Sequence, residues 1–554
     1  MKKHIICTII FYTFLINVIL GVKREQDGPV VTINSGKIQG VSKLGLDVFY
    51  GIPYAAPPTG ELRWKRPQPV AEWGETYTRM TKTRTSACPQ EIMTDGLCSL
   101  GYCPKQVSED CLHMNIFVPQ QTNNNMNATL TYAVMVFIHG GAFESFAGTN
   151  KMFDGDSIAK EGNVIVVTFN YRLGLFGTFY TEGTTEDGNF ALFDQQMALE
   201  WVHTNIHHFK GDPNKVTIVG QSAGAQSVGF HLTNPKSSTF FSQAIIMSLP
   251  AVPFKTLQQA MMVSSLIATH VNCTPGDFVC LRATPMEQLI DVVHDNRKQI
   301  TDAVVVRANG TALDTFELFT PYIDGDLITK RSMVDIFQNA PPLKPVIYGT
   351  MGQEAISYIG PYISMLKDVT PSAALAVLKG IDAIPDMTRD ALKGYLAGSN
   401  DTIEVVEKLG NDLLFRCPAR KLLEFSLKAG NHEVWLYENM NSISSTGPNL
   451  TANACNNQPC HGSDLAYLFS AFHLIQQNVH IKYGSDEKQV SRDLIQYWTN
   501  FIKFGNPNGE MGSQVSWPMY ELNDGKKSLR LNANDNKIEE NAGGNLCDAL
   551  DPYL

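Results

Sequence analysis

The chain has 554 residues, of which 44% are hydrophobic and 18% are charged. This composition is typical of a packed globular protein and excludes disorder as the dominant state, because disordered chains are poor in apolar residues and rich in charge. The 44 basic and 54 acidic residues give a net charge of −10. We therefore expect no nucleic-acid partner, since such a partner requires a basic surface.

The N-terminus has the pattern of a secretory signal peptide. Two lysines precede an apolar run over residues 5–20, and the small residue Gly21 follows it. These lengths favour cleavage near Gly21, with an uncleaved signal anchor as the alternative, because the run lacks a small-x-small cleavage site. We expect residues 1–21 to be removed and residues 22–554 to form one domain without a transmembrane anchor.

Cysteines and glycosylation sequons also indicate export. Removal of the signal peptide takes Cys7 with it and leaves ten cysteines, an even number that suits five disulfide bonds. The five sequons begin at Asn127, Asn272, Asn309, Asn400 and Asn449. Single sequons occur by chance, but together with the signal pattern they predict a secreted protein or one in the lumen of a secretory or endolysosomal compartment.

Beyond residue 130, apolar runs of strand length alternate with helical stretches. The runs expected to form strands are 134–138, 164–169, 216–219, 244–247, 345–348 and 434–437. Such continuous runs suit strands that are buried on both faces of a sheet, and the spacing of Leu192, Gln196, Leu199 and Val202 predicts a helix. We expect an α/β fold with a mostly parallel central sheet that helices cover on both faces.

A candidate nucleophile follows the run at 216–219. Gly220-Gln221-Ser222-Ala223-Gly224 has the G-x-S-x-G form of a nucleophile elbow, a strained turn between a strand and a helix. The flanking glycines avoid clashes in such a turn, and the N–H after the serine lies at the positive end of the helix. Taken alone, the pentapeptide is also compatible with a plain glycine-rich turn.

The run at 134–138 leads into a second glycine-rich segment, His139-Gly140-Gly141-Ala142. Glycine N–H groups in this position form an oxyanion hole in hydrolases with such an elbow. Gly140, Gly141 and Ala223 would then supply three donors, and the loss of one donor typically lowers turnover about 10²–10³-fold. We interpret His139 as a structural residue of this loop rather than as a catalytic base.

Five further segments occur in a fixed order along the chain. They are 50–55 (YGIPYA), 109–116 (EDCLHMNI), 170–177 (NYRLGLFG), 188–195 (GNFALFDQ) and 209–213 (FKGDP). With the two glycine-rich segments they resemble the type-B carboxylesterases, the cholinesterase-like branch of the α/β-hydrolase fold, although FKGDP has lysine where the family has glycine. The resemblance covers essentially the whole mature chain and implies a serine esterase that acts on small carboxylic esters with no cofactor and no metal.

The resemblance also implies a catalytic triad in the order Ser, acid, His. The family's acid segment is matched at 349–355 (GTMGQEA), and its H-G-x-[DE] segment is matched at 461–464 (HGSD). Ser222 would be the nucleophile, His461 the general base, and Glu354 the carboxylate that orients the imidazole. Glu354 as an ordinary loop carboxylate is the alternative.

Twelve other histidines compete with His461. The spacing of His203 and His207 would suit a pair of metal ligands, and His208 is adjacent. No third ligand is evident, so we expect a solvated helix face there.

The resemblance implies three disulfide pairings: Cys88–Cys111, Cys273–Cys280 and Cys417–Cys547. The remaining cysteines would form two pairs outside the family pattern, Cys98–Cys103 and Cys455–Cys460, of which the second would brace the loop before His461. A zinc site at these cysteines is a weak alternative, because the C-x₂-C spacing is missing.

Two departures from the family pattern bear on the substrate. Cholinesterases carry a tryptophan in the loop closed by the first bridge, whereas residues 88–111 contain Tyr102 and no tryptophan. The residue before the nucleophile is usually Glu in that branch, and here it is Gln221. Both departures argue against a cationic choline ester. Phe319 resembles an aromatic residue of the acyl pocket, with core packing as an equal alternative.

The expected function is that of a serine carboxylesterase that works through an acyl-enzyme intermediate. One alternative is a catalytically silent adhesion or binding protein, since this fold also serves on cell surfaces, but here all three triad positions are filled. The other is an interfacial lipase, which a mobile apolar lid would distinguish. Substrate chain length and oligomeric state stay open.

Overall fold

The computed structural model describes residues 26–73, 76–77, 84–92, 101–120, 131–180, 188–341, 343–359, 363–380, 389–443, 457–476, 481, 483–509, 515–533 and 535–550. The expected signal peptide with Cys7, two cysteines of the expected bridges (Cys98 and Cys455) and two sequons (Asn127 and Asn449) lie outside the described residues.

Within the described residues, one 13-stranded sheet runs in the order β1-β2-β3-β5-β7-β6-β8-β9-β10-β11-β12-β13, and β4 pairs with β2. The strands are β1 (Gln26–Ile33), β2 (Gly36–Lys43), β3 (Leu46–Pro53), β4 (Thr76–Tyr77), β5 (His113–Pro119), β6 (Tyr132–Ile138), β7 (Ile165–Phe169), β8 (Gly211–Gln221), β9 (Gln243–Met247), β10 (Val346–Met351), β11 (Val434–Asn439), β12 (Ser528–Leu531) and β13 (Lys537–Glu539). Neighbouring strands from β7 to β12 are parallel, and antiparallel strands flank them on both sides. The expected α/β fold with a parallel central sheet is confirmed.

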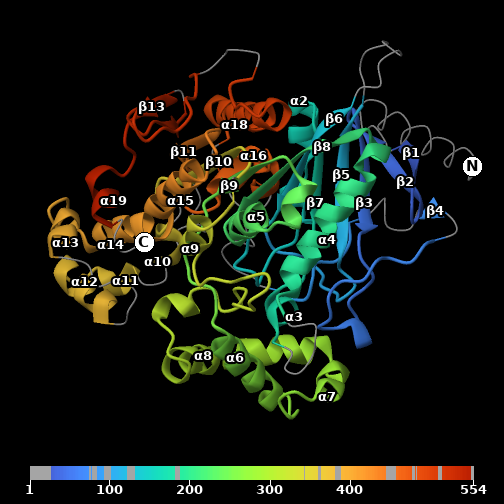
Figure 1. Cartoon of the computed structure of the whole chain (residues 1–554), viewed down its shortest axis with the longest axis horizontal. Coiled ribbons are helices and arrows are strands. Elements are labelled where there is room, and N and C mark those ends of the chain that lie inside the picture. Colours follow the sequence, from blue (N-terminus) through green and yellow to red (C-terminus); the bar gives the residue numbers. More distant parts are fainter. Residues whose placement is uncertain are drawn as a thin grey trace, which may run out of the picture.

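Helices surround the sheet (Figure 1). They are α2 (Asp156–Gly162), α3 (Gly174–Thr178), α4 (Phe190–Asn205), α5 (Ala223–Thr233), α6 (Leu257–His270), α7 (Phe278–Ala283), α8 (Met286–Arg307), α9 (Met333–Gln338), α10 (Ile356–Ile359), α11 (Ile363–Leu366), α12 (Pro371–Gly380), α13 (Arg389–Leu396), α14 (Thr402–Asn411), α15 (Cys417–Lys428), α16 (Ser463–Leu468), α17 (Phe472–Ile475), α18 (Ser485–Phe504) and α19 (Gly544–Leu550). Figure 1 shows α6, α7 and α8 together at the lower edge of the molecule. None of the described helices combines the length and the apolar character that crossing a bilayer requires.

The core lies on both faces of the sheet, as the continuous apolar runs predict. Successive side chains of a strand point to opposite faces. Accordingly, Val134 and Val136 of β6 belong to a cluster with side chains of α4, α5 and α15. Met135 and Phe137 of the same strand belong to a second cluster, with side chains of α2, α16 and α18.

Buried polar contacts and disulfides connect segments of the chain that resemble the carboxylesterase pattern. The guanidinium of Arg172 binds the Asp194 carboxylate through two bonds of 2.8 and 2.7 Å, in a region closed to solvent. The three pairings implied by the resemblance are present: Cys88–Cys111, Cys273–Cys280 and Cys417–Cys547. Cys103 and Cys460 are disulfide-bonded as well, but their expected partners lie outside the described residues.

Candidate active site

The candidate catalytic residues lie in loops that follow four parallel strands of the central sheet, β6, β8, β10 and β11. Ser222 directly follows β8, the glycine-rich segment at 139–142 follows β6, and Glu354 follows β10. His461 lies between β11 and α16. The carboxyl ends of parallel strands share one edge of a sheet, which is where open α/β folds bind ligands. The topology therefore brings these residues, far apart in sequence, to one edge.

Ser222 occupies the turn between β8 and α5 with the backbone of a nucleophile elbow. Its φ of 59° and ψ of −127° lie in a region that non-glycine residues rarely adopt. Helix α5 begins at the next residue, Ala223, so Ser222 lies at the helix N-terminus. The structure thus has the strand–turn–helix context that the pentapeptide predicts, rather than a plain turn.

Both glycines of the pentapeptide are required by close backbone contacts. A Cβ atom on Gly224 would lie 2.1 Å from the carbonyl oxygen of Ile138, the last residue of β6. A Cβ atom on Gly220 would lie 2.2 Å from the carbonyl oxygen of Gly224. The turn therefore packs against the neighbouring strand with no room for a side chain.

The expected oxyanion loop lies directly against the elbow. A Cβ atom on Gly140 would lie 2.6 Å from the Gln221 carbonyl oxygen and 2.9 Å from Cβ of Ser222. Gly141 has a φ of 100°, which favours glycine. Among the described residues, the N–H groups of Gly140, Gly141 and Ala223 have no hydrogen-bond acceptor. Three N–H groups beside Ser222 thus match the arrangement expected of an oxyanion hole.

His139 is buried within this loop and makes contacts that hold it in place. Its Nδ1 lies 2.8 Å from the Gly140 carbonyl oxygen, and its own carbonyl accepts a 2.7 Å bond from the Tyr171 hydroxyl. The two rings stack with centroids 4.4 Å apart. Burial lowers the pKa of His139 to about 4, so its imidazole is neutral at physiological pH. These contacts agree with the structural role expected from the sequence.

His461 and Glu354 form the pair that the resemblance implies. Nδ1 of His461 lies 2.6 Å from Oε2 of the fully buried Glu354, whose Oε1 accepts a 2.6 Å bond from the Met351 N–H. A β-bridge between Gln353 and Cys460 ties the two loops together next to this contact. A carboxylate at Nδ1 holds the proton there and leaves Nε2 of the neutral ring as the basic atom.

In this structure Ser222 and His461 are each hydrogen-bonded to a third residue. The side-chain nitrogen of Gln221 lies 3.1 Å from Nε2 of His461. The hydroxyl of Tyr358 shares a hydrogen bond with Ser222, and its ring lies 5.3 Å from the His461 ring. No bond between Ser222 and His461 is found in the described part of the chain. Catalytic hydrogen bonds are often absent without substrate, and a rotation of the serine side chain changes its partner.

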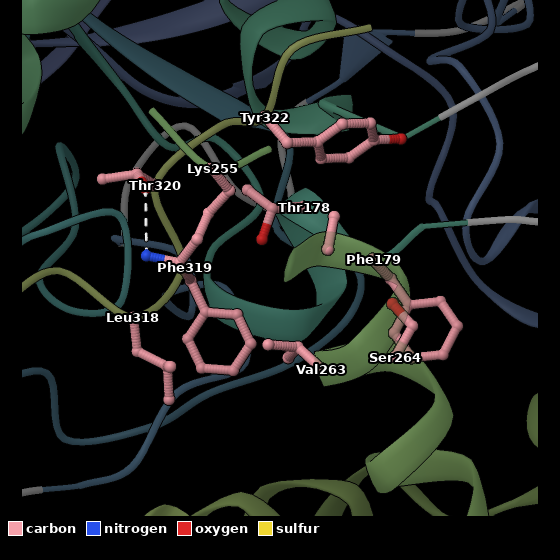
Figure 2. A pocket seen from close by; sticks show the side chains of 10 residues that line it. Thr178, Phe179, Lys255, Val263, Ser264, Leu318, Phe319, Thr320 and Tyr322 are labelled. Atoms are coloured by element: carbon pink, nitrogen blue, oxygen red, sulfur yellow. Dashed lines mark hydrogen bonds between the residues drawn. The ribbon is translucent and has the colours of Figure 1, made fainter. Parts of the chain in front are cut away.

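Tyr358 has no recognisable signal in the sequence, whereas Phe319 resembles an acyl-pocket aromatic and Tyr102 lies in the loop where cholinesterases carry a tryptophan. Tyr102 is buried, and its hydroxyl donates to the Gly462 carbonyl oxygen at 3.2 Å, so it is not an open platform for a cation. Phe319 belongs to an apolar cluster with Trp64 and side chains of α6 and α8. Figure 2 shows its ring in the lining of a small cavity beside Lys255. This placement is that of core packing.

Asp464 is a second buried carboxyl next to the pair of His461 and Glu354. Burial and the nearby charge of Glu354 raise its pKa to about 7, against the opposing effect of His461. Its Oδ2 lies 3.5 Å from the Tyr437 hydroxyl, and its Oδ1 has no partner among the described residues. Asp464 therefore keeps its proton in the folded protein at a pH where the unfolded chain releases it.

Because of this difference in pKa, the effect of Asp464→Asn on the free energy of unfolding should depend on pH. Between the ordinary pKa of 3.8 and the raised value of about 7, the folded state binds more protons, so the free energy of unfolding falls as pH rises. Asparagine does not titrate, and the variant should gain stability relative to wild type by up to about 4 kcal/mol between pH 4 and pH 8. Denaturant unfolding of both proteins across this range measures the gain, and parallel curves would contradict the assignment.

The chain is similar to known carboxylesterases over nearly its whole length. The model of the carboxylesterase family matches residues 27–549. The cAMP-regulated D2 protein of Dictyostelium discoideum is 33% identical over 517 residues, which are 92% of this chain and 91% of that protein. The para-nitrobenzyl esterase of Bacillus subtilis (strain 168) is 31% identical over 499 residues, 89% of this chain and 92% of that protein.

Carboxylesterase 5A of Canis lupus familiaris is 31% identical over 535 residues, which cover 91% of this chain and 86% of that protein. Among solved structures, a PNB esterase superposes with a TM-score of 0.75 at 27% identity, covering 94% of this chain and 99% of that one.

Proposed function

The chain belongs to the carboxylesterase family and is a hydrolase of carboxylic esters, and from this premise we propose that it cleaves neutral esters through an acyl-enzyme formed on Ser222. The observation that carries the proposal is the strained elbow at Ser222 beside the hydrogen-bonded pair of His461 and Glu354. A nucleophile, a base and an orienting carboxylate are the three parts of a serine-hydrolase triad.

In the acylation half, Oγ of Ser222 attacks the ester carbonyl carbon while Nε2 of His461 takes the hydroxyl proton. The carbonyl oxygen becomes an oxyanion that the N–H groups of Gly140, Gly141 and Ala223 stabilise. Collapse of this intermediate breaks the bond to the alcohol oxygen, which receives the proton back from Nε2 and leaves as the alcohol.

In the deacylation half, a water molecule attacks the acyl group on Ser222 and gives its proton to His461. The second oxyanion occupies the same three donors, and its collapse returns the proton to Oγ and releases the carboxylic acid. Glu354 holds the imidazole in the required tautomer throughout, and it stabilises the imidazolium that forms in each half.

Specificity for neutral esters is tested by a matched pair of acetate esters, acetylcholine and its uncharged carbon isostere 3,3-dimethylbutyl acetate. Gln221 carries no charge, and Tyr102 is buried with its hydroxyl bonded to Gly462, so neither residue offers a cation the carboxylate or the open platform that cholinesterases use. We expect kcat/KM for the neutral ester to exceed that for acetylcholine by about 10-fold or more. A preference for acetylcholine would contradict the specificity, and failure to hydrolyse either ester would overturn the proposed activity.

We also propose that residues 22–554 are one exported domain, with residues 1–21 as its signal peptide. The disulfides support this proposal, because such bonds persist in oxidising compartments. So does the exposure of all three described sequon asparagines, Asn272, Asn309 and Asn400. N-terminal sequencing and glycan mapping of the secreted protein test this point, and an intact N-terminus would contradict signal cleavage.

A further inference from the structure

Glu317 is a buried carboxyl whose hydrogen bonds are incomplete. Its side chain is 3% exposed, and its Oε2 atom has no hydrogen-bond partner among the described residues. Burial raises the pKa of this carboxyl, and the neighbouring Gln226 side chain lowers it to a smaller extent through hydrogen bonding. Leaving a buried polar atom without a partner typically costs about 1–3 kcal/mol, so such an atom needs an explanation.

The neighbouring Lys255 does not supply the missing partner. Its ammonium binds oxygens of the 314–320 segment: the Asp314 carbonyl, the Glu317 carbonyl at 3.0 Å and the Thr320 hydroxyl at 3.4 Å. Figure 2 shows the last of these bonds. Within the described residues, no ion pair joins the Lys255 ammonium to the Glu317 carboxylate. Lys255 therefore binds the backbone of this segment, and Oε2 of Glu317 stays available to a further hydrogen-bond partner.

Two contacts place this segment against the nucleophile from the side of Tyr358 and α5. The Phe316 ring lies 4.5 Å from the ring of Tyr358, which shares a hydrogen bond with Ser222. Gln226, the partner of Glu317, lies in the first turn of α5, and its N–H donates to the Ser222 carbonyl at 3.0 Å.

A third contact comes from the oxyanion loop on the other side. The N–H of Leu318 donates to the Glu144 carboxylate at 3.2 Å, and the Glu144 N–H donates to the Gly141 carbonyl at 2.8 Å. The 316–318 segment thus bridges the oxyanion loop and Tyr358, the two features that flank Ser222. The charge of Glu317 also acts on Tyr171 beneath the oxyanion loop and on Tyr358.

We propose that Glu317 and the Tyr358 hydroxyl make the site polar on the side of the 316–318 segment, and that this side receives the acyl group and selects esters whose acyl group carries a hydroxyl near the carbonyl. The proposal rests on the proposed function, since it names the acyl group that Ser222 accepts. A hydroxyl suits this position because it both donates and accepts. Burial raises the pKa of Glu317 to about 8, so the carboxyl is present in both its acid and its ionised form near neutral pH, and a hydroxyl binds either.

The test compares p-nitrophenyl esters in which a hydroxyl replaces a methyl group of the same size. The two pairs are 2-hydroxypropionate with 2-methylpropionate and 3-hydroxybutyrate with 3-methylbutyrate. A hydrogen bond to a buried carboxyl is worth about 1.5–3 kcal/mol, so kcat/KM for the hydroxy ester of at least one pair should be about 10- to 100-fold higher. Preference for the methyl ester in both pairs would overturn the proposal.

Variants then assign the preference to Glu317. Glu317→Leu should reduce the ratio of the two kcat/KM values to about one or below, and Glu317→Gln, which keeps a hydrogen-bonding group of the same shape, should retain part of it. Glu407→Leu is the matched control. Glu407 is also buried and has an oxygen without a partner among the described residues, but it lies in α14 and not in the 316–318 segment. Its ratio should equal that of wild type.

Both esters of a pair are measured on the same preparation, so a partial loss of folded enzyme does not change the ratio of their kcat/KM values. If Glu317→Leu does not fold, the ratios of the wild-type enzyme alone test the proposal. An unchanged ratio in Glu317→Leu would refute the role of this residue. Failure of the proposed function is distinct, since the enzyme would then hydrolyse none of the four esters, whereas failure of this inference alone leaves hydrolysis without a preference for hydroxyl.

Discussion

Ser222→Ala is expected to lower kcat/KM for a simple ester such as p-nitrophenyl butyrate by about 10⁴- to 10⁶-fold. Alanine removes the atom that becomes acylated and leaves only binding and the oxyanion donors. The fold should be unaffected, because the side chain is small and alanine bears the positive φ of this turn about as well as serine does. Steady-state kinetics with a melting curve for each protein measures both effects.

Ser248 offers a matched control for this substitution. It is buried, follows the neighbouring strand β9 and has a φ of 53°, so it resembles Ser222 in exposure and backbone conformation. Ser248→Ala should keep kcat/KM within a few-fold of wild type. If Ser222→Ala retained wild-type activity, or if both variants lost activity equally, the assignment of the nucleophile would be wrong.

Glu354→Gln should have the second-largest effect, a decrease in kcat of about 10⁴-fold. In a serine triad, an amide in place of the orienting carboxylate stabilises the wrong tautomer of the histidine while the geometry stays intact. Here both carboxylate oxygens are engaged, one by Nδ1 of His461 and the other by the Met351 N–H, so the amide must lose one of these bonds. A decrease below 10-fold would point to Asp464, the other buried carboxyl near His461, as the functional acid.

The central strands could be predicted from sequence because each is a continuous apolar run buried on both faces. The predicted runs at 134–138, 216–219 and 434–437 all lie within β6, β8 and β11, and the two runs at 164–169 and 345–348 begin one residue early. The antiparallel strands β1 to β3 were not predicted. β1 and β2 mix buried, partly buried and exposed residues, which gives a weaker pattern than an unbroken apolar run. β3 is almost entirely buried, but Asp47, Gly51 and Pro53 interrupt its apolar residues.

The site was predictable to the extent that its residues belong to local motifs. The elbow at Ser222 and the glycines at 140 and 141 are such motifs, because close backbone contacts require glycine there. Glu354 and His461 came from resemblance, since no local pattern distinguishes them from other acids and histidines.

Glu317 and Tyr358 were missed for a different reason. Each lies in an ordinary stretch of sequence, and the contacts that link Tyr358 to Ser222 and the 316–318 segment to Tyr358 arise only from packing between distant segments. Gln221 was interpreted as the loss of a negative charge, and the structure adds its contact with Nε2 of His461.

The central claim, that Ser222 is the residue acylated during turnover, is tested most directly by covalent labelling with an organophosphate. The reagent phosphorylates an activated serine and stops at that stage, so peptide mass mapping identifies the nucleophile. We expect one label per chain, on the peptide that contains Ser222, with activity lost in proportion to labelling. A label on any other residue, or complete inactivation without a label on Ser222, would contradict the account.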